Sequence, residues 1–472
     1  MSARASRRYI RARTAAAFFA ALVGITDALP PRIRYGYVHR LTGLLWRRPL
    51  PALTFSPARP AVEGPSSSDL GEDAIVCALL TGAMDVGGIG SVVEVLATSL
   101  PRAGVRPVVV CTEDGTRANR LRAAGVDVRV AVAEDDAQRV FAELAPQVAQ
   151  LHAAPEHLVS AAQRRGIPVV PVLHNTEIHY SRARWRRFAE LLQSSAAAIA
   201  VSELVRDYHA RHVPASTVEL IRVVPNAIPA QAPVTADERR NSRDALATVL
   251  GADLGDDIVF VCLARYDSQK NIAGLVAAFG KEVTDVSARL VVAGEPSDWV
   301  ELRRADAIRR SAPGADRIAL LGASDARALL AAADAFVLDS FFEGWPVAAT
   351  EAAAFALPLV LADFGGAREL VARDVGASVL VANATGPAAL VSDRRVARAR
   401  RGVRRQPNAA AVGVAVDNVA SRVRTGARPR VLSSSELIDA MTDGHAAVLR
   451  SVAAGRDGTV GGARDAFGGI SR

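Results

Sequence analysis

Lysine, cysteine and aromatic residues are all scarce in this chain of 472 residues. Its three cysteines, Cys77, Cys111 and Cys262, lie far apart inside apolar runs, without the spacing of a zinc site or the even number of a disulfide framework. We therefore expect them to be small buried residues in a reducing compartment. Aromatic residues make up 5% of the chain, too few for a surface that stacks on bases, so nucleic-acid binding is disfavoured.

Acidic residues are nearly missing from the first 50 residues, which hold ten arginines and only Asp27. The formal charge of the whole chain is +8, so the remainder is close to neutral. The basic character is therefore a property of one arm, and the body lacks the charge excess of a nucleic-acid-binding protein. Half of the residues are apolar, which excludes global disorder, and the length favours two to three domains.

The apolar run in this arm, residues 14–29, is shorter than the ~20 residues that a membrane-spanning helix needs. Two interpretations stay open. One is an interfacial helix that dips apolar side chains into lipid while arginines bind anionic headgroups, and the other is an unordered extension. The apolar side chains of such a helix would be Phe18, Phe19, Leu22 and Val23. A signal peptide is disfavoured because no cleavage pattern of small residues precedes Pro30, so we expect a cytoplasmic protein. Under the first interpretation residues 1–50 contact the inner face of the membrane.

From residue 74 onward, short apolar runs alternate with amphipathic stretches. Apolar runs with little polar alternation suit strands buried on both faces, and strand–helix alternation implies a parallel sheet. In the first half we expect strands at 74–80, 107–111, 126–132, 147–152, 167–173, 196–201 and 218–224. In the second half we expect strands at 258–264, 288–293, 318–321, 335–338, 357–361 and 378–381. The pattern predicts an α/β protein with two tandem doubly wound, Rossmann-like domains that face each other across a cleft.

The domain boundaries follow from a pause in this pattern after residue 226. We expect an arm and Pro/Ser/Gly-rich linker at 1–72, an N-terminal Rossmann-like domain at 73–228 and a C-terminal Rossmann-like domain at 229–432. Residues 433–455 have the periodicity of a final helix, and 456–472 are expected to be a flexible tail.

A glycine-rich turn follows the first predicted strand. Gly88 and Gly90 would let backbone N–H groups approach an anion or a sugar at the start of a helix. The turn is not a dinucleotide fingerprint, because Val93 stands where the third glycine would be. A nicotinamide dehydrogenase is also disfavoured because Cys111, not an acidic residue, ends the second strand.

Two cations follow the strand at 258–264. Arg265 closes the strand and Lys270 comes five residues later, just before the next predicted helix. Fixed charge and helix-terminal N–H groups together suit a diphosphate at this place. Because the chain has only two lysines, Lys270 and Lys281, against 55 arginines, a lysine here indicates a requirement for a compact charge.

Two glutamates eight residues apart frame the motif that begins at Glu343. Gly344 and Pro346 place Glu343 in a loop, whereas Glu351 falls inside the alanine-rich helix that follows. An idle carboxylate is rare in so apolar a setting, and paired carboxylates suit the hydroxyls of ribose and hexose. We therefore expect both to line the cleft.

Three further groups lie at strand ends. His174 and His152 each end an apolar strand, where an imidazole can hydrogen-bond a sugar hydroxyl or orient a phosphate, although a structural histidine is the alternative for both. Gly365 and Gly366 open another helix and offer backbone donors near a phosphate.

In order along the chain, these motifs resemble the family-four (group 1) retaining glycosyltransferases, which have the GT-B fold of two Rossmann-like domains. The matching segments are GGIG, the strand-end His174, AVSE at 200–203, VPNAI at 224–228, ARYDSQKN, VVAGE at 291–295, EGWPVAATEA and LPLVLADFGGARELV. The resemblance implies that residues 73–228 form the acceptor domain and residues 229–432 the nucleotide-sugar donor domain. In the donor domain, it implies that Arg265 and Lys270 hold the diphosphate. It also implies that Glu351 binds the ribose, that Glu343 contacts the transferred sugar, and that His174 lies beside the bond being broken. The other donor-site residues that it implies are Gly88, Gly90, Gly344, Trp345, Gly365 and Gly366.

Three departures from the family pattern stand out. Ala227 replaces the usual glycine of VPNAI, Asp339 stands where proline is common, and the Arg-rich stretch 394–430 is expected to be irregular. In this fold the final helix crosses back to the first domain, which is the expected place of residues 433–455.

The resemblance implies an enzyme that transfers a sugar from a nucleotide-diphosphate sugar to a glycan or lipid-linked acceptor, in cell-envelope or extracellular polysaccharide synthesis. No D-x-D run is present, so we expect no metal ion and no cofactor beyond the nucleotide-sugar co-substrate. One rival is a glycogen-type synthase. A rival of another class is a catalytically silent scaffold that binds sugar nucleotide and recruits partners.

Overall fold

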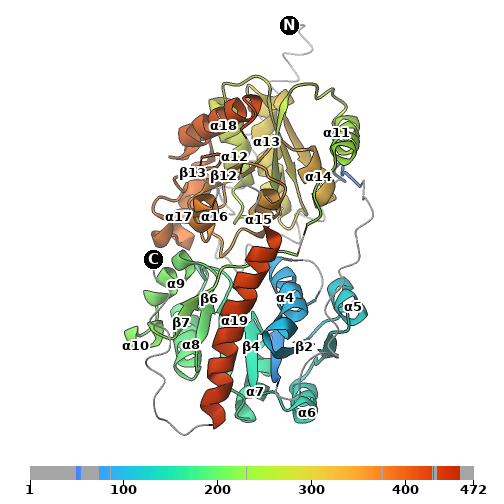
Figure 1. Cartoon of the computed structure of the whole chain (residues 1–472). Coiled ribbons are helices and arrows are strands. Elements are labelled where there is room, and N and C mark those ends of the chain that lie inside the picture. Colours follow the sequence, from blue (N-terminus) through green and yellow to red (C-terminus); the bar gives the residue numbers. More distant parts are fainter. Residues whose placement is uncertain are drawn as a thin grey trace.

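The computed structural model of the chain describes residues 49–54, 74–84, 87–229, 231–373, 376–427, 429 and 433–457. Two lobes, each built around one sheet, lie one above the other in Figure 1. Every strand pair in both sheets is parallel. The predicted α/β class and the two doubly wound units are therefore confirmed.

The first lobe holds seven strands in the order β3-β2-β1-β4-β5-β6-β7. The strands are β1 (Ile75–Thr81), β2 (Val105–Cys111), β3 (Asp127–Val130), β4 (Val148–His152), β5 (Val169–Leu173), β6 (Ala198–Ala200) and β7 (Ile221–Val223). The helices between them are α4 (Gly88–Ser99), η3 (Leu100–Ala103), α5 (Thr116–Ala123), α6 (Glu134–Leu144), α7 (Glu156–Arg164), α8 (Arg182–Gln193), α9 (Glu203–Ala210) and α10 (Ala215–Val218). Each strand falls where an apolar run predicted one, because central parallel strands are covered by helices on both faces.

The second lobe holds six strands in the order β10-β9-β8-β11-β12-β13. They are β8 (Ile258–Leu263), β9 (Ala288–Ala293), β10 (Ile318–Leu321), β11 (Ala335–Leu338), β12 (Leu359–Ala362) and β13 (Val379–Val381). The helices are α11 (Ala236–Leu250), α12 (Ile272–Glu282), α13 (Trp299–Ser311), η4 (Ala315–Arg317), α14 (Ala326–Ala332), α15 (Val347–Ala354), α16 (Ala367–Ala372), η5 (Ala388–Leu390), α17 (Asp393–Arg401), η6 (Val403–Arg405) and α18 (Ala409–Arg424). All six predicted strands of this half are present.

The strand order reverses at one point in each sheet, between β1 and β4 in the first and between β8 and β11 in the second. In open parallel sheets, ligands bind beyond the carboxyl ends of the strands at such a reversal. The loops at these ends carry Gly88, Lys270 and Glu343, and β4 itself ends at His152. The topology therefore brings the motifs from distant parts of the sequence toward the junction of the lobes.

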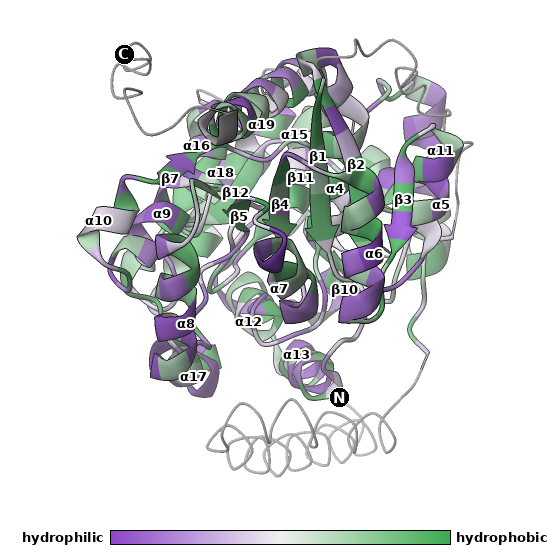
Figure 2. Cartoon of the chain, turned by 90° about the horizontal axis from the view of Figure 1, so that it is seen from below, coloured by the Kyte–Doolittle hydropathy of each residue, from purple (hydrophilic) through white to green (hydrophobic). Residues whose placement is uncertain are grey.

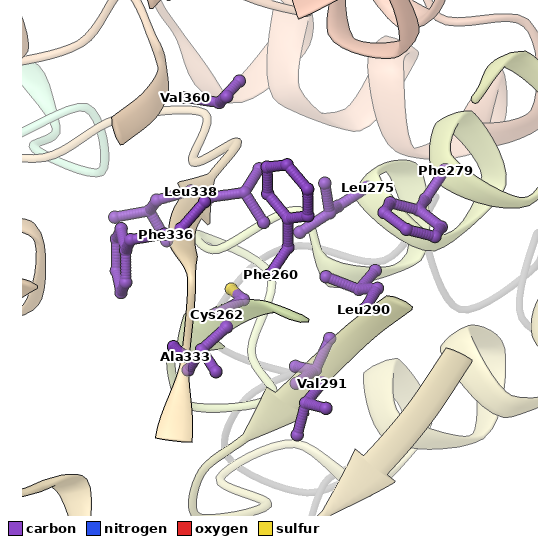
Figure 3. Packing of buried hydrophobic residues seen from close by; sticks show 14 of the residues in the cluster. Phe260, Cys262, Leu275, Phe279, Leu290, Val291, Ala333, Phe336, Leu338 and Val360 are labelled. Carbon is purple, nitrogen blue, oxygen red and sulfur yellow. The ribbon is translucent and has the colours of Figure 1, made fainter. Parts of the chain in front are cut away.

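Both sheets are buried between apolar helix faces. In the second lobe, Phe260, Phe279 and Phe336 belong to one buried cluster with Cys262 and aliphatic residues such as Leu275 and Leu290, as Figure 3 shows. All three cysteines are free and buried, as predicted, and burial raises the pKa of the Cys77 thiol to about 12. Figure 2 shows the same division by hydropathy: β1 and β11 are green, whereas α6 and α8 carry purple residues.

The last helix, α19 (Ser434–Asp457), lies along the first lobe (Figure 1, red). Thr442 Oγ1 donates a hydrogen bond to Ser99 Oγ at 2.7 Å, and the Ala227 backbone N–H donates to Met441 Sδ at 3.1 Å. A Cβ on Gly444 would be 2.8 Å from the Val224 side chain, so the helix and β7 meet at close range. The chain therefore returns to the first lobe after the second is complete.

Residues 49–54 pack on the second lobe. Backbone N–H groups of Gly322 and Asp325 donate to the carbonyls of Pro51 and Leu53, each at 2.8 Å, and the Leu53 side chain is buried. The rest of the predicted arm and linker, 1–48 and 55–73, and the tail 458–472 lie outside the described residues. Among the helices that the structure describes, none has both the length and the apolar content to cross a membrane.

The Arg-rich stretch corrects one expectation. Residues 394–430 were expected to be irregular, but α17 and α18 occupy much of it. Arginine is a good helix former, and the apolar face of α18, including Val412, Val416 and Val419, packs into the core of the second lobe. The dense arginines obscured this helical period in the sequence.

Candidate active site

The centre of the candidate site is an ion pair between Lys270 and Glu343. Lys270 Nζ lies 2.5 Å from Glu343 Oε1, and the Glu343 carboxylate also accepts hydrogen bonds from Ser340 Oγ at 2.7 Å and Gln269 Nε2 at 3.1 Å. Only 8% of the Glu343 side chain and 17% of the Lys270 side chain are exposed. A buried charge pair with three donors on the carboxylate holds both end groups in a fixed geometry.

The loop after β8 is built to present Lys270. Asp267 Oδ1 accepts from the backbone N–H groups of Gln269 and Lys270, at 2.9 and 3.1 Å, which closes a tight turn. Tyr266 is fully buried beneath this turn and donates to the carbonyls of Val292 and Leu321. The turn is therefore anchored both by its own backbone and by the sheet.

A buried amide and carboxylate network holds the residue after Lys270. Asn271 has a left-handed backbone (φ 50°), and its Nδ2 donates to Asp339 Oδ2 at 2.8 Å. Asn408 Nδ2 donates to the other Asp339 oxygen at 2.8 Å, and Gln406 exchanges two hydrogen bonds with Asn271. Burial raises the pKa of Asp339 to about 7, with the two amide donors acting in the opposite direction. Asp339, a departure from the family pattern, thus ties the Lys270 loop to the loop that carries Glu343.

The two lobes meet at close range at Gly344. A Cβ at this position would lie 1.7 Å from the carbonyl oxygen of His174 in the other lobe, so only glycine fits. Ser202 Oγ of the first lobe donates to the Gly344 carbonyl at 3.2 Å. Gly88 also reaches the second lobe, since a Cβ there would be 3.6 Å from Val347 at the start of α15.

The glycine-rich loop after β12 packs against the same point. Gly366 N–H donates to the Gly344 carbonyl at 2.9 Å, and a Cβ on Gly365 would be 2.3 Å from that oxygen. The backbone donor of Gly366 is therefore already used inside the protein. The expectation that it faces a phosphate does not fit this arrangement, which gives Gly366 a packing role.

Trp345 is buried rather than open to the cleft. Its indole N–H donates to Thr350 Oγ1 at 2.9 Å, and a Cβ on Gly366 would strike its ring. The side chain joins the apolar cluster of the first lobe, so it fastens α15 to that lobe. The ring is therefore a packing group and not the donor-site contact that the resemblance implied.

The remaining predicted residues lie around this centre. Glu343 is in the loop and Glu351 is inside α15, as the sequence predicts, and Glu351 is partly buried. Arg265 is the most open of the group: 58% of its side chain is exposed, and it pairs with Asp267 Oδ2 at 3.2 Å. Gly90 is buried in the first turn of α4. The structure thus brings Lys270, Glu343 and the His174 backbone together and leaves Arg265 at the rim.

His174 is in contact with a second histidine. Its Nε2 lies 2.9 Å from Nδ1 of His152, which ends the neighbouring strand β4. Burial lowers the pKa of His174 to about 4 and that of His152 well below 6.5, so both rings are neutral at pH 7. Sequence reasoning singled out both histidines but not the link between them, nor the network around Asp339.

No group of three or more His, Cys, Asp or Glu side chains in the described ranges is arranged to hold a metal ion. The charged groups at the centre are instead a lysine and a carboxylate. Such a pair suits an anion on one side and hydroxyl groups on the other.

Comparisons with known proteins identify the family of the chain. Residues 86–232 match the family described as Glycosyltransferase Family 4, and residues 257–393 match the family described as Glycosyl transferases group 1. The two matches together cover the larger part of both lobes. A curated relative, alpha-maltose-1-phosphate synthase of Mycolicibacterium smegmatis, is 29% identical over 185 residues. That match covers 38% of this chain and 47% of the relative, so it spans about half of the relative's length.

Solved structures share the fold over most of the chain. HepE of Anabaena, solved with UDP and glucose, has a TM-score of 0.57 at 16% identity and covers 79% of this chain and 100% of its own. A sucrose-phosphate synthase of Thermosynechococcus elongatus has a TM-score of 0.56 at 16% identity, with 80% and 100% covered. These likenesses show the GT-B arrangement of two Rossmann-like lobes. The chain belongs to the group 1, family 4 glycosyltransferases.

Proposed function

We propose that the protein transfers a sugar from a nucleotide-diphosphate sugar to an acceptor hydroxyl, with retention at the anomeric carbon and without a metal ion. The observation that carries this proposal is the buried Lys270–Glu343 pair at the reversal point of the second sheet. A lysine in that position meets the diphosphate, and the glutamate beside it meets the hydroxyls of the sugar.

The mechanism follows from charge. When the bond between the anomeric carbon and the phosphate oxygen breaks, negative charge grows on the leaving diphosphate. Lys270 Nζ has a carboxylate partner in this structure, and an ammonium group has three N–H donors, so the others can bind the phosphate oxygens. Glu343 keeps Ser340 and Gln269 as donors, so its position does not depend on the lysine alone.

The new bond forms between the acceptor oxygen and the same face of the anomeric carbon. The acceptor proton passes to an oxygen of the departing diphosphate, so no protein nucleophile is required. The close contact of His174 with Gly344 supports this route, because a junction shut this tightly keeps water from competing with the acceptor.

The donor class has support from similar proteins. HepE is described in complex with UDP-glucose, and the relative in Mycolicibacterium smegmatis is a maltose-1-phosphate synthase, so a hexose donor is our first choice. We propose a glycan or lipid-linked acceptor of the cell envelope or extracellular matrix. The basic arm, with ten arginines in 50 residues, supports a place at the inner face of the membrane.

A thermal-stability screen tests the donor. UDP-, GDP-, ADP- and CDP-sugars are added in turn to the full chain. A nucleotide sugar that binds the native state raises the melting temperature of the protein. We expect one nucleotide series to stabilise the protein. If none does so at millimolar concentration, the donor assignment is wrong.

Two further measurements test the chemistry. With the donor found, NMR of the product reports the anomeric configuration, which we expect to be that of the donor. EDTA should leave the rate of transfer unchanged, because fixed charges at the diphosphate replace a metal. Strong inhibition that magnesium reverses, or an inverted product, would overturn this part of the proposal.

A further inference from the structure

Four polar side chains, of which His174 is partly buried and the other three are buried, form a continuous hydrogen-bonded chain from the candidate active site to the last helix. His174 Nε2 is 2.9 Å from His152 Nδ1, and His152 Nε2 is 3.0 Å from Gln150 Oε1. Gln150 Nε2 is in turn 2.9 Å from Nδ1 of His445, on α19. Gln150, His152 and His445 are each completely shielded from solvent.

The amide of Gln150 gives this chain a direction. Its oxygen accepts, so His152 carries its proton on Nε2 and leaves Nδ1 unprotonated. Nδ1 of His152 must then accept from His174, which places the His174 proton on Nε2. At the other end, the Gln150 N–H donates to Nδ1 of His445, so the His445 proton is also on Nε2.

All three rings are neutral in this arrangement. Burial lowers the pKa of His445 to about 3 and of His174 to about 4, and the neighbouring rings lower that of His152 further. A neutral imidazole has one donor and one acceptor. Each side chain in the series therefore donates to the next, from His174 at one end to His445 at the other. Hydrogen bonds that run in one direction strengthen one another.

The packing of α19 fixes the position of His445, the last side chain in the hydrogen-bonded series. Thr442 and Met441, within one turn of His445, bond to Ser99 and Ala227 of the first lobe. Nε2 of His445 is buried without a partner among the described residues, which is costly for a group whose only role is packing. A leucine or phenylalanine would fill this place without that cost, so the polar ring points to a role in the chain.

We propose that His445, Gln150 and His152 are positioning residues that hold His174 in the tautomer protonated on Nε2. His174 then offers an unprotonated Nδ1, which accepts a hydrogen bond from a sugar hydroxyl and cannot bind a phosphate oxygen that carries no proton. Of the two roles that an imidazole at this strand end can have, the tautomer selects the hydrogen bond to a sugar hydroxyl over the orientation of a phosphate. The inference rests on the proposed function for the nature of the ligand, but not for the tautomer itself.

The tautomer is measured without any substrate. The full-length chain is labelled with ¹⁵N-histidine, and two-bond ¹H–¹⁵N spectra report which ring nitrogen of each histidine carries the proton. Resonances are assigned with His174→Gln, His152→Gln and His445→Asn variants. We expect His174, His152 and His445 all to be protonated on Nε2 at pH 7. A His174 ring protonated on Nδ1, or charged, overturns the proposal.

Variants at the far end test the coupling. His445→Leu removes the acceptor for Gln150 and should release the His174 tautomer into a mixture, whereas His445→Asn keeps an acceptor near the place of Nδ1 and should preserve it. Asp443 is exposed on the same helix, so Asp443→Asn is the matched control and should leave the His174 tautomer unchanged. If His445→Leu does not fold, Gln150→Leu interrupts the hydrogen-bonded chain without a substitution in α19 itself. An unchanged His174 signal in every folded variant that breaks the chain contradicts the coupling.

A pair of ligands separates this inference from the proposed function. We measure the affinity of the nucleoside diphosphate alone and of the intact nucleotide sugar identified by the stability screen. His445→Leu should weaken binding of the nucleotide sugar about fivefold, the effect of one hydrogen bond, and leave the nucleoside diphosphate unchanged. Equal losses for both ligands would place His174 on the phosphate and refute the assigned role. If neither ligand binds the parent chain, the donor proposal fails while the tautomer result stands.

Discussion

His174 of the first lobe and Gly344 of the second touch through their backbones, with no room for even a methyl group between them. His174 directly follows β5 of the first lobe, and Gly344 directly follows the glutamate that pairs with Lys270. The two lobes are thus held in register at the point where both halves of the candidate site meet.

Gly344→Ala should therefore separate the lobes. The added Cβ would lie 1.7 Å from the His174 carbonyl oxygen, and the collision is with backbone, so it cannot be relieved by a side-chain rotation. We expect transfer to fall by at least tenfold, with a larger radius of gyration in small-angle scattering. Gly455→Ala, where a Cβ meets nothing within 4 Å, is the control. Wild-type activity and dimensions for Gly344→Ala would contradict the importance of this contact.

Asp339 gives a prediction about pH. Its pKa is about 7 in the folded protein, against an ordinary value of 3.8 for an exposed aspartate. Between these two pH values the folded state therefore binds more protons than the unfolded state. Stability from this residue is therefore fully present below pH 4 and is lost as the pH rises to 7. The loss amounts to several kcal/mol, at about 1.4 kcal/mol for each pKa unit.

Asp339→Asn removes the ionisable carboxyl group and with it this pH dependence of stability. The buried Asn408 Oδ1 has no partner among the described residues, so its amide can turn to accept from the new side chain. We measure the free energy of unfolding of both proteins by urea denaturation. We expect the wild type to lose stability relative to Asp339→Asn as the pH rises from 4 to 7. A difference that does not change with pH would show that Asp339 is ionised throughout.

The basic arm gives a prediction about membranes. Removal of residues 1–48 leaves Leu53 and its contacts on the second lobe in place, so the remainder should fold. We expect the full chain to sediment with vesicles that contain phosphatidylglycerol and the shortened chain to stay in solution, with binding weakened by salt. Equal sedimentation of both chains would rule out the arm as the contact.

Much of the fold could be read from the sequence because buried parallel strands are apolar runs, such as 258–264 before Arg265. Site residues at strand ends, including Lys270 and Glu343, could be found because parallel strands gather their carboxyl ends on one edge. The link from His174 to His445 could not be found, since its members are up to 295 residues apart and no spacing relates them. The buried position of Trp345 was missed because an aromatic residue in a loop motif resembles a ligand contact and a core residue equally.

The central claim is that Lys270 binds the diphosphate of an activated sugar, and the two lysines of this chain allow a direct measurement. Lys281 is 67% exposed and pairs with Glu282 on α12, so Lys281→Ala removes the same charge away from the site. Calorimetric titration of the nucleotide sugar into Lys270→Ala should show affinity reduced about a hundredfold or more, the usual cost of a preorganised charge partner, whereas Lys281→Ala should bind as the wild type does. Equal affinity in the two variants would contradict the assignment of the site.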